Sequence, residues 1–197
     1  DDFSINLDRV SNDVKLLFLP NPNSPTGLYI SIDKIERFLE SFNGILVVDE
    51  AYIDFSGKKS AISLVDRFPN LVVIRTFSKA FSLAGIRLGY CFANKDVVLA
   101  LDKVRDSYNV NTFSAYCGYL IFDFMDELKE KISLIIKNRE FLKDELSLMN
   151  FFIIPSFANF LFVKPPISAY KLYTLLKENN ILVRYFPSPD KINLFYR

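Results

Sequence analysis

Histidine is absent from this sequence of 197 residues, and so is tryptophan. The absence of histidine excludes Ser-His-Asp and Cys-His nucleophilic catalysis, histidine-ligated zinc, and the usual general base near neutral pH. Any acid–base chemistry must therefore rest on lysine, tyrosine, aspartate or glutamate.

Other scarcities narrow the class of protein further. The formal net charge is only +1 and no basic run is visible, which argues against nucleic-acid or anionic membrane partners. No apolar stretch approaches the ~20 residues that span a bilayer, and the first residues do not resemble a signal peptide. The two cysteines, Cys91 and Cys117, lack metal-binding spacing, which favours reduced thiols over a disulfide. We therefore expect a cytoplasmic protein.

Short apolar runs dominate the first half of the chain. "LLFL" (16–19), "ILVV" (45–48) and "LVVI" (71–74) lack polar alternation, which is typical of strands buried on both faces of a parallel sheet. Between the first two runs, residues 31–42 place apolar side chains at helical spacing behind Ser31, a suitable N-cap. This order predicts a right-handed βαβ crossover.

The second half has a different pattern. Residues 113–150 are mostly helical in character, and Gly118 within them indicates a break or a close contact. Four strand-like runs and one helix are predicted after it, with the strands at 151–155, 159–165, 181–186 and 192–197 and the helix at 168–180. We predict an α/β fold with a mainly parallel sheet in residues 1–110, and a long connecting helix with a small α+β domain in residues 111–197. The small sheet and the abrupt ends suggest a piece of a longer protein.

Polar residues follow each of the three predicted strands. The first strand leads into "PNPNSPTG" (20–27), the second into Asp49 and Tyr52, and the third into "RTFSK" (75–79). Each has a simpler explanation: a turn, a helix cap, a core tyrosine, a surface lysine. Because ligands of open α/β sheets bind beyond the carboxyl ends of the strands, we expect these groups to converge in one crevice.

Lys79 suggests a specific chemistry for that crevice. A lysine amine that is desolvated and lies near a cation such as Arg87 is suited to forming an imine with an aldehyde. Hydroxyls of Thr76 and Ser78, with Arg87, suit a phosphate dianion, and Asp49 suits a pyridine nitrogen that must stay protonated. Together these demands describe pyridoxal 5′-phosphate.

The same segments carry a family resemblance. "PNPNSPTG", "VVDEAYIDF" and "RTFSKAFSLAGIRLGY" resemble the signature segments of fold-type I aminotransferases, in order and at suitable separations. With "YNVN" (108–111), they are most similar to the histidinol-phosphate aminotransferase family. The resemblance implies an enzyme that transfers an amino group between L-glutamate and imidazole-acetol phosphate, giving 2-oxoglutarate and L-histidinol phosphate. It also implies a homodimer with shared active sites and small-molecule substrates.

The resemblance assigns roles to residues of the cofactor site. It makes Lys79 the imine-forming lysine and proton carrier, Asp49 the partner of the pyridinium nitrogen, and Tyr52 the partner of the ring oxygen. Thr76, Ser78 and Arg87 correspond to positions that contact or support the phosphate.

Four further residues concern the substrate and one departure from the family. Arg184 and Arg197 match arginines that hold the anionic end of the substrate. The family commonly has asparagine where this chain has Ser24, so either Ser24 or the preceding Asn23 is expected to bond the ring oxygen.

Two other interpretations stay open. A related chemistry on the same scaffold, such as an aromatic amino-acid aminotransferase or a threonine-phosphate decarboxylase, would use the same cofactor residues. A non-catalytic domain is the second, since the chain lacks the segments that normally precede it in the family.

Overall fold

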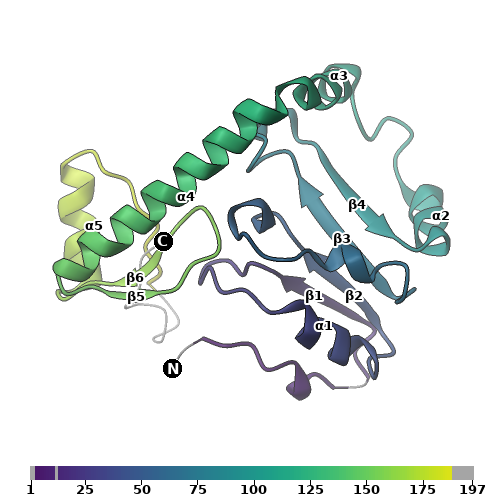
Figure 1. Ribbon diagram of the computed structural model, residues 1–197, viewed down its shortest axis with the longest axis horizontal. Coiled ribbons are helices and arrows are strands. Elements are labelled where there is room, and N and C mark those ends of the chain that lie inside the picture. Colours follow the sequence, from purple (N-terminus) through teal and green to yellow (C-terminus); the bar gives the residue numbers. More distant parts are fainter. Residues whose placement is uncertain (1–2, 12, 188–197) are drawn as a thin grey trace.

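The computed structural model describes residues 3–11 and 13–187. Its main sheet has four strands in the order β1-β2-β3-β4 (Figure 1). Their bounds are β1 Leu16–Pro20, β2 Ile45–Asp49, β3 Leu71–Thr76 and β4 Gly89–Ala93. The first three strands run parallel, and β4 pairs antiparallel with β3. The three apolar runs are confirmed as parallel strands, and the α/β class with a mainly parallel sheet is confirmed with them.

Burial differs between these strands. β2 and β3 each bury three consecutive residues, as their uninterrupted apolar sequences predict. In β1, Phe18 is 62% exposed and Leu16 is also exposed. The expectation of burial on both faces is therefore wrong for β1. The reason is positional, because β1 is the edge strand of this sheet.

Helix α1 (Ile32–Leu39) connects β1 to β2 and packs on the sheet. It buries Ile32, Ile35 and Leu39 in one cluster with residues of β2 and β3 such as Val48 and Val73. This is the apolar stripe expected of an amphipathic helix. Ser31 occupies the N-cap position as predicted, but its side chain makes no capping hydrogen bond.

Two elements were not predicted. β4 contains the sequence "GYCFA", in which an apolar run follows Gly89. Helix α2 (Lys95–Val104) follows, and Asn94 caps it by accepting a hydrogen bond from the Asp96 N–H at 3.0 Å. α2 buries none of its residues, although Val97, Leu101 and Val104 lie at helical spacing along it.

The long helical pattern is confirmed as α3 (Thr112–Leu120), a short 3₁₀ turn and α4 (Met125–Leu148). Gly118 marks a close contact, because a Cβ atom there would lie 2.5 Å from Cδ2 of Leu88. Figure 1 shows α4 running from the sheet to the second, smaller part of the molecule.

Five 3₁₀ segments lie in the described part of the first 124 residues: η1 Leu7–Arg9, η2 Ile53–Phe55, η3 Ala61–Leu64, η4 Ala84–Ile86 and η5 Ile121–Phe124.

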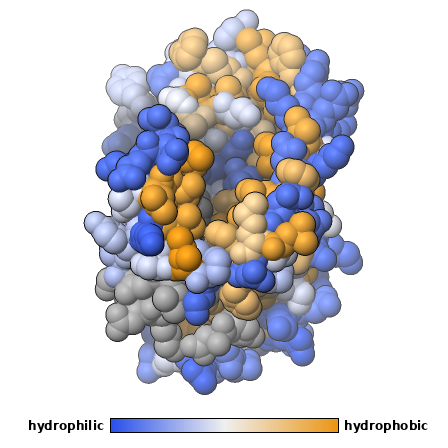
Figure 2. All heavy atoms as spheres, turned by 90° about the vertical axis from the view of Figure 1, so that its left-hand side faces the viewer, coloured by the Kyte–Doolittle hydropathy of each residue, from blue (hydrophilic) through white to orange (hydrophobic). Residues whose placement is uncertain are grey.

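The smaller part contains an antiparallel pair, β5 (Phe152–Ile154) and β6 (Phe162–Lys164), and helix α5 (Ala169–Glu178). Leu161, Val163 and Ala169 form its core. The predicted strand at 181–186 is not formed; only an isolated bridge at Tyr185 is present there. The predicted strand at 192–197 lies outside the described residues. Figure 2, which views this end, shows apolar side chains gathered in strips between hydrophilic ones.

Across the described parts of the chain, no helix combines the length and apolar character that a bilayer crossing requires. The division into domains at residues 110 and 111 stays a prediction, although α3 begins at Thr112, immediately after that position.

Candidate active site

The register of the sheet brings the ends of its parallel strands to one edge. Pro20 of β1 lies opposite Asp49 of β2, and Asp49 lies opposite Ile74 of β3. β1 and β2 therefore end at the same level, and β3 continues past that level to Thr76. The loops that follow carry Asn23 and Ser24, then Tyr52, then Ser78 and Lys79. This shared edge is what the predicted convergence requires, and the meeting of all these side chains in one crevice stays a prediction.

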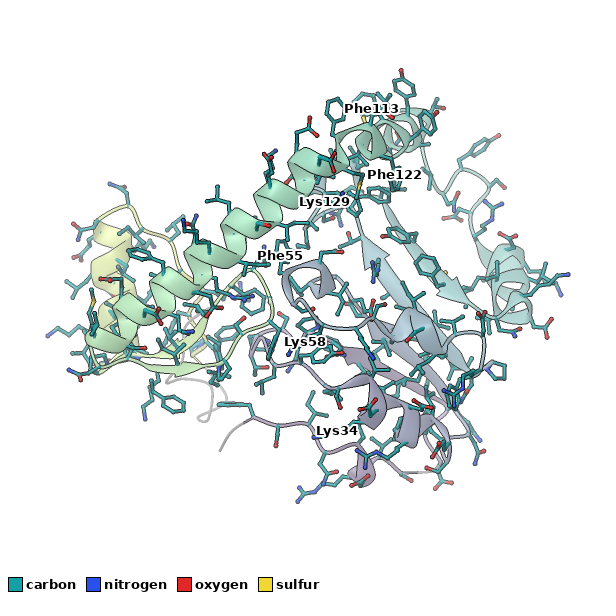
Figure 3. All side chains as sticks on the ribbon, in the orientation of Figure 1. Lys34, Phe55, Lys58, Phe113, Phe122 and Lys129 are labelled. Carbon is teal, nitrogen blue, oxygen red and sulfur yellow. The ribbon has the colours of Figure 1, made fainter. Side chains whose placement is uncertain are left out.

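Lys79 lies in a tightly turned loop after β3. The Ser82 N–H donates to the carbonyl oxygen of Lys79 at 3.0 Å, and the N–H of Leu83 donates to the carbonyl oxygen of Phe77 at 3.0 Å. Phe77 is buried and anchors the loop, with its ring 4.8 Å from that of Phe81. Both rings also meet Phe122 of η5 edge-on, and Figure 3 labels Phe122 beside this loop.

The amine of Lys79 faces an aromatic ring. Its Nζ lies 5.2 Å from the centre of the Tyr52 ring, within the range of a cation–π contact. Tyr52 itself is buried, and its ring meets Phe160 edge-on at 5.2 Å. Lys79 is half-buried, and no carboxylate of the described residues forms an ion pair with it. An amine held in this way is available to an external partner.

Asp49 is also half-buried, at the last position of β2. Its Oδ1 accepts a hydrogen bond from the Ala51 N–H at 2.9 Å, which fixes the side chain at the start of the following turn. In the described part of the chain it forms no ion pair with lysine or arginine. A carboxylate without its own cation, at the end of a buried strand, is suited to a cationic ring nitrogen.

Thr76 and Ser78 lie on the same loop but differ in what their hydroxyl groups do. The Thr76 hydroxyl accepts from the Ser78 N–H at 3.0 Å and donates to the carbonyl oxygen of Leu88 at 3.4 Å. These bonds make Thr76 a residue that shapes the loop. Arg87 is exposed, has a left-handed φ of 55°, and donates from Nη1 to the Ala84 carbonyl oxygen at 3.0 Å.

The loop after β1 uses Asn23 for its own structure. The Asn23 side-chain amide donates to Thr26 Oγ1 at 3.1 Å, and the Asn23 backbone accepts from the Gly27 N–H at 2.7 Å. Ser24 is half-buried beside it. The Asn23 amide is therefore committed to holding its own loop, and which of Asn23 and Ser24 bonds the ring oxygen stays a prediction.

The predicted substrate residues lie in the last part of the chain. Arg184 is exposed, and its guanidinium carbon lies 5.7 Å from the centre of the Phe186 ring. Arg197 lies outside the described residues. The grouping of these two arginines with the cofactor residues therefore stays a prediction.

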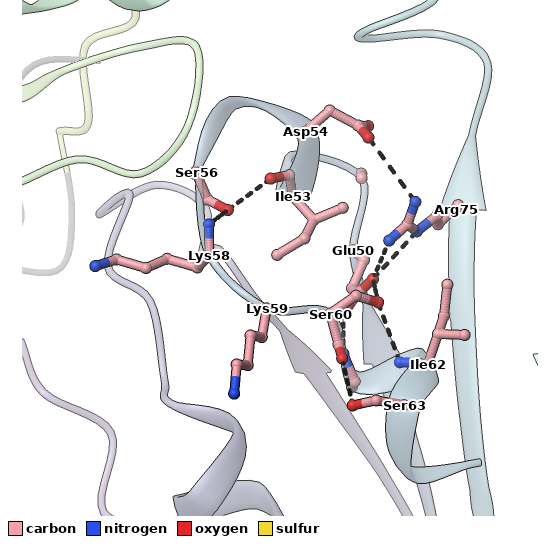
Figure 4. A network of polar contacts seen from close by, with 12 residues as sticks. Glu50, Ile53, Asp54, Ser56, Lys58, Lys59, Ser60, Ile62, Ser63 and Arg75 are labelled. Carbon is pink, nitrogen blue, oxygen red and sulfur yellow. Dashed lines mark hydrogen bonds and ion pairs between the residues drawn. The ribbon is translucent and has the colours of Figure 1, made fainter. Parts of the chain in front are cut away.

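A buried ion-pair network beside the site was not predicted (Figure 4). The Glu50 side chain is fully buried. Its Oε2 accepts from Ser60 Oγ at 2.6 Å and from Arg75 Nε and Nη2 at 3.1 and 2.9 Å, and its Oε1 accepts from the Ala61 N–H at 2.6 Å. Arg75 Nη1 also lies 3.8 Å from Asp54 Oδ1. The signal in the sequence is weak: an acid directly after a buried strand needs a partner, and the arginine before "TFSK" supplies it.

The charges of this network shift several pKa values. Burial would lower the pKa of Arg75, but its hydrogen bonds and charge attraction to Glu50, with Asp54, raise it overall. Burial raises the pKa of Asp54, and Arg75 offsets this only in part. Burial also raises the pKa of Tyr90, again against the influence of Arg75.

Arg139 of α4 is a second residue that the sequence did not reveal. Its Nη1 donates to the carbonyl oxygens of Phe55 at 3.1 Å and Ala158 at 2.7 Å. Phe55 belongs to η2, beside Tyr52, and Figure 3 labels it between η2 and α4. One guanidinium thus holds together the long helix, the turn after Tyr52 and the loop before β6.

A separate cavity of about 700 Å³ lies between the N-terminal segment and α1. Its lining includes Ser4, Asn6, Lys34, Arg37 and Phe38, and none of the predicted site residues. Lys34 and Arg37 are exposed surface cations, so this hollow has no built-in chemistry comparable to that of the strand ends.

The fold and these segments define a family. A model of the family described as aminotransferase class I and II matches residues 1–193, and the chain belongs to that family.

Individual relatives are more specific. Histidinol-phosphate aminotransferase 1 of Oceanobacillus iheyensis is 42% identical over 199 aligned residues, covering 98% of this chain and 56% of that protein. The crystal structure of the histidinol-phosphate aminotransferase of Sinorhizobium meliloti, in complex with pyridoxal-5′-phosphate, has a TM-score of 0.85 at 25% identity, covering 94% of this chain and 52% of that one. A decarboxylase from Sulfurospirillum multivorans has a TM-score of 0.87 at 29% identity, covering 99% of this chain and 60% of that one. The chain spans about half the length of the curated relatives it matches.

Proposed function

We propose that this chain carries most of one cofactor half-site of a pyridoxal 5′-phosphate-dependent aminotransferase. The observation that carries the proposal is the half-buried Lys79 amine, which faces the Tyr52 ring at 5.2 Å and lacks a carboxylate partner among the described residues. The half-buried Asp49 carboxylate, likewise without a cation there, supports it. An unpaired amine and an unpaired acid at one sheet edge match the two polar ends of that cofactor.

When bound, pyridoxal 5′-phosphate supplies an aldehyde that condenses with amines and a ring that accepts electrons from the substrate Cα. Asp49 would hold the proton on the ring nitrogen, and Tyr52 would orient the ring oxygen. Ser24 would bond the same oxygen, with Asn23 holding its loop. Lys79 would bind the aldehyde at rest and carry a proton from the substrate Cα during turnover.

The phosphate would be held near the loop that contains Lys79. Ser78 and Arg87 would donate to it, since a hydroxyl and a guanidinium are suited to a dianion. Thr76 would act on the phosphate through the shape of the loop, because its hydroxyl already bonds the Ser78 N–H and the Leu88 carbonyl oxygen.

For the whole protein we propose transamination between L-histidinol phosphate and 2-oxoglutarate, in histidine biosynthesis. The 42% identity to a histidinol-phosphate aminotransferase over almost the whole chain supports this substrate. Arg184 and Arg197 would hold the anionic end of the substrate. We also propose a cytoplasmic homodimer, for which the exposed aromatic side chains of α3 offer surface to bury; they are Phe113, Tyr116 and Tyr119.

Reduction with borohydride tests the cofactor part of this proposal. The protein, expressed with any residues that flank this chain in its gene, is mixed with pyridoxal 5′-phosphate, reduced, digested and analysed by mass spectrometry. We expect the pyridoxyl group on Lys79 and its loss in Lys79→Ala, with turnover reduced more than about 10³-fold. Lys58 offers a matched control, because its Nζ lies 5.1 Å from the Phe157 ring in a similar contact. Labelling of Lys58 in place of Lys79, or full turnover in Lys79→Ala, contradicts the proposal.

A decarboxylase is the second candidate, favoured by the structural similarity to the Sulfurospirillum multivorans enzyme. Turnover assays separate the two. Histidinol phosphate with 2-oxoglutarate should yield glutamate, whereas a decarboxylase would release carbon dioxide from threonine phosphate. Tyrosine and phenylalanine as amino donors test an aromatic aminotransferase in the same assay. A folded protein in which borohydride fixes no cofactor on Lys79 would support the interpretation as a non-catalytic domain.

A further inference from the structure

Backbone pairing between β2 and β3 ends just before the site. The last paired residues are Asp49 and Ile74, and one more backbone bond follows, from the Glu50 N–H to the Ile74 carbonyl oxygen at 2.9 Å. Beyond this point the segment after β2 leaves the sheet, whereas β3 continues to Thr76 and pairs there only with β4. The segments that carry Tyr52 and Lys79 are therefore not held to each other by the β2–β3 ladder.

The Glu50–Arg75 pair continues the connection with side chains. Two N–H groups of Arg75 donate to the same oxygen of Glu50, at 3.1 and 2.9 Å. The other donors to the carboxylate are Ser60 Oγ and the Ala61 N–H, so both of its oxygens are satisfied. A buried ion pair stabilises a structure only when its geometry is good and its remaining hydrogen bonds are made, and both conditions hold here.

Arg75 also reaches a third segment. Its Nη1 lies 3.8 Å from Asp54 of η2, two residues after Tyr52 (Figure 4). The Arg75 guanidinium thus contacts Glu50, which follows Asp49, and Asp54, which lies near Tyr52. Arg75 itself precedes Lys79 by four residues in the sequence. Arg139, the other half-buried arginine near the site, contacts neither Glu50 nor Asp54 in the described structure.

We propose that Arg75 is a positioning residue for the cofactor site: by holding Glu50 and Asp54, it sets the placement of Asp49 and Tyr52 relative to Lys79. This inference rests on the proposed function. The physical reason is geometric, since a planar guanidinium has a fixed fork of donors, whereas lysine offers a single flexible ammonium group. Displacing a reacting group by about 1 Å is enough to cost a large part of its effect.

The test compares two substitutions that each remove side-chain hydrogen bonds, one within β3 and one at the residue directly before it. Arg75→Lys keeps the charge but loses the fork. Asn70→Ala is the matched control, because Asn70 donates to the carbonyl oxygens of Phe42 and Gly44 at 2.9 Å each, at the opposite end of β3. For each protein we would measure the unfolding of the apoprotein in urea, the dissociation constant of pyridoxal 5′-phosphate, and the pH midpoint at which the absorption band of the lysine-bound cofactor changes.

We expect Arg75→Lys to weaken cofactor binding about tenfold or more and to move the pH midpoint by about 0.5 unit or more. Asn70→Ala should lower the stability of the apoprotein while leaving affinity and midpoint within error of wild type. If Arg75→Lys does not fold, Asp54→Asn serves instead, because it removes one contact of Arg75 and keeps the buried pair; a smaller change in the same direction is expected.

Three results would overturn the inference. The first is an Arg75→Lys protein whose affinity and midpoint match those of wild type. The second is Asn70→Ala shifting both as strongly as Arg75→Lys, since the role of Arg75 would then be that of any stabilising residue. The third is wild-type protein in which borohydride fixes no cofactor on Lys79; this result removes the proposed function as well, which distinguishes it from the first two.

Discussion

The Nζ atom of Lys79 lies 5.2 Å from the centre of the Tyr52 ring, although the two residues follow different strands. Tyr52 comes three residues after β2 and Lys79 three residues after β3. Their contact therefore depends on the parallel pairing of these strands, and not on proximity in the sequence. It places an amine beside the phenol that is proposed to orient the cofactor.

Substituting Tyr52 by phenylalanine tests what the phenol contributes beyond its ring. Tyr52→Phe keeps the buried ring, its contact with Phe160 and its contact with Lys79, and removes only the hydroxyl. We expect borohydride still to fix the cofactor on Lys79, and turnover to fall by about tenfold, the value of one hydrogen bond. Steady-state rates and the mass of the reduced peptide check both points. Unchanged turnover would mean that the hydroxyl does not act on the cofactor.

Substituting Asp49 by asparagine tests the carboxylate. Asn can still accept the hydrogen bond from the Ala51 N–H, which is 2.9 Å from Oδ1 of Asp49, so the local turn should survive. It does not carry the negative charge that would keep a ring nitrogen protonated. We expect turnover to fall by about 10² to 10³-fold while the pyridoxyl group still forms on Lys79. Asp106→Asn, at an exposed position, is the control and should leave turnover unchanged.

Part of this site could be predicted from the sequence because it depends on simple patterns. Apolar runs mark β2 and β3, and the carboxyl ends of parallel strands share one edge, so Asp49 and Lys79 were expected to converge. The partner of Glu50 could not be predicted, because Arg75 is 25 positions away in sequence and surface arginines are common. Its burial depends on how η2 and η3 fold over the sheet.

Other differences have similar physical causes. The strand expected at 181–186 has a suitable apolar sequence, but a strand requires a neighbour to pair with, and the described residues provide only the bridge at Tyr185. β4 was not predicted, although an apolar run follows Gly89; it pairs antiparallel with β3. Phe18 is exposed, although burial was expected, because β1 lies at the edge of the sheet.

Replacing Gly27 by alanine should destabilise the protein. Gly27 has a φ of +80°, which side chains other than glycine disfavour, and an added Cβ would lie 2.7 Å from Cβ of Ser156. Backbone strain and overpacking together should cost about 2–4 kcal/mol of unfolding free energy. Gly57→Ala is a matched control, because Gly57 has a φ of +62° but no atom within 4 Å of an added Cβ. It should cost only about 1 kcal/mol. Equal losses in urea unfolding would show that the contact with Ser156 is relieved at little cost.

The raised pKa of Asp54 should make the free energy of unfolding depend on pH, and a substitution can assign this dependence to that residue. Burial raises its pKa in the folded state, more than the attraction of Arg75 lowers it. Between the unfolded and folded pKa values the native state holds a proton that the unfolded state has lost, so the contribution of Asp54 to stability falls as pH rises through this window.

At neutral pH the cost of burying the charged Asp54 carboxylate remains, and Asp54→Asn removes this cost. We expect the variant to be slightly more stable than wild type at pH 7 and this difference to shrink as pH falls towards 4. Urea unfolding at several pH values checks the sign, with Asp106→Asn as the exposed control. A variant less stable than wild type at pH 7 would mean that the ion pair with Arg75 outweighs the cost of burying the carboxylate.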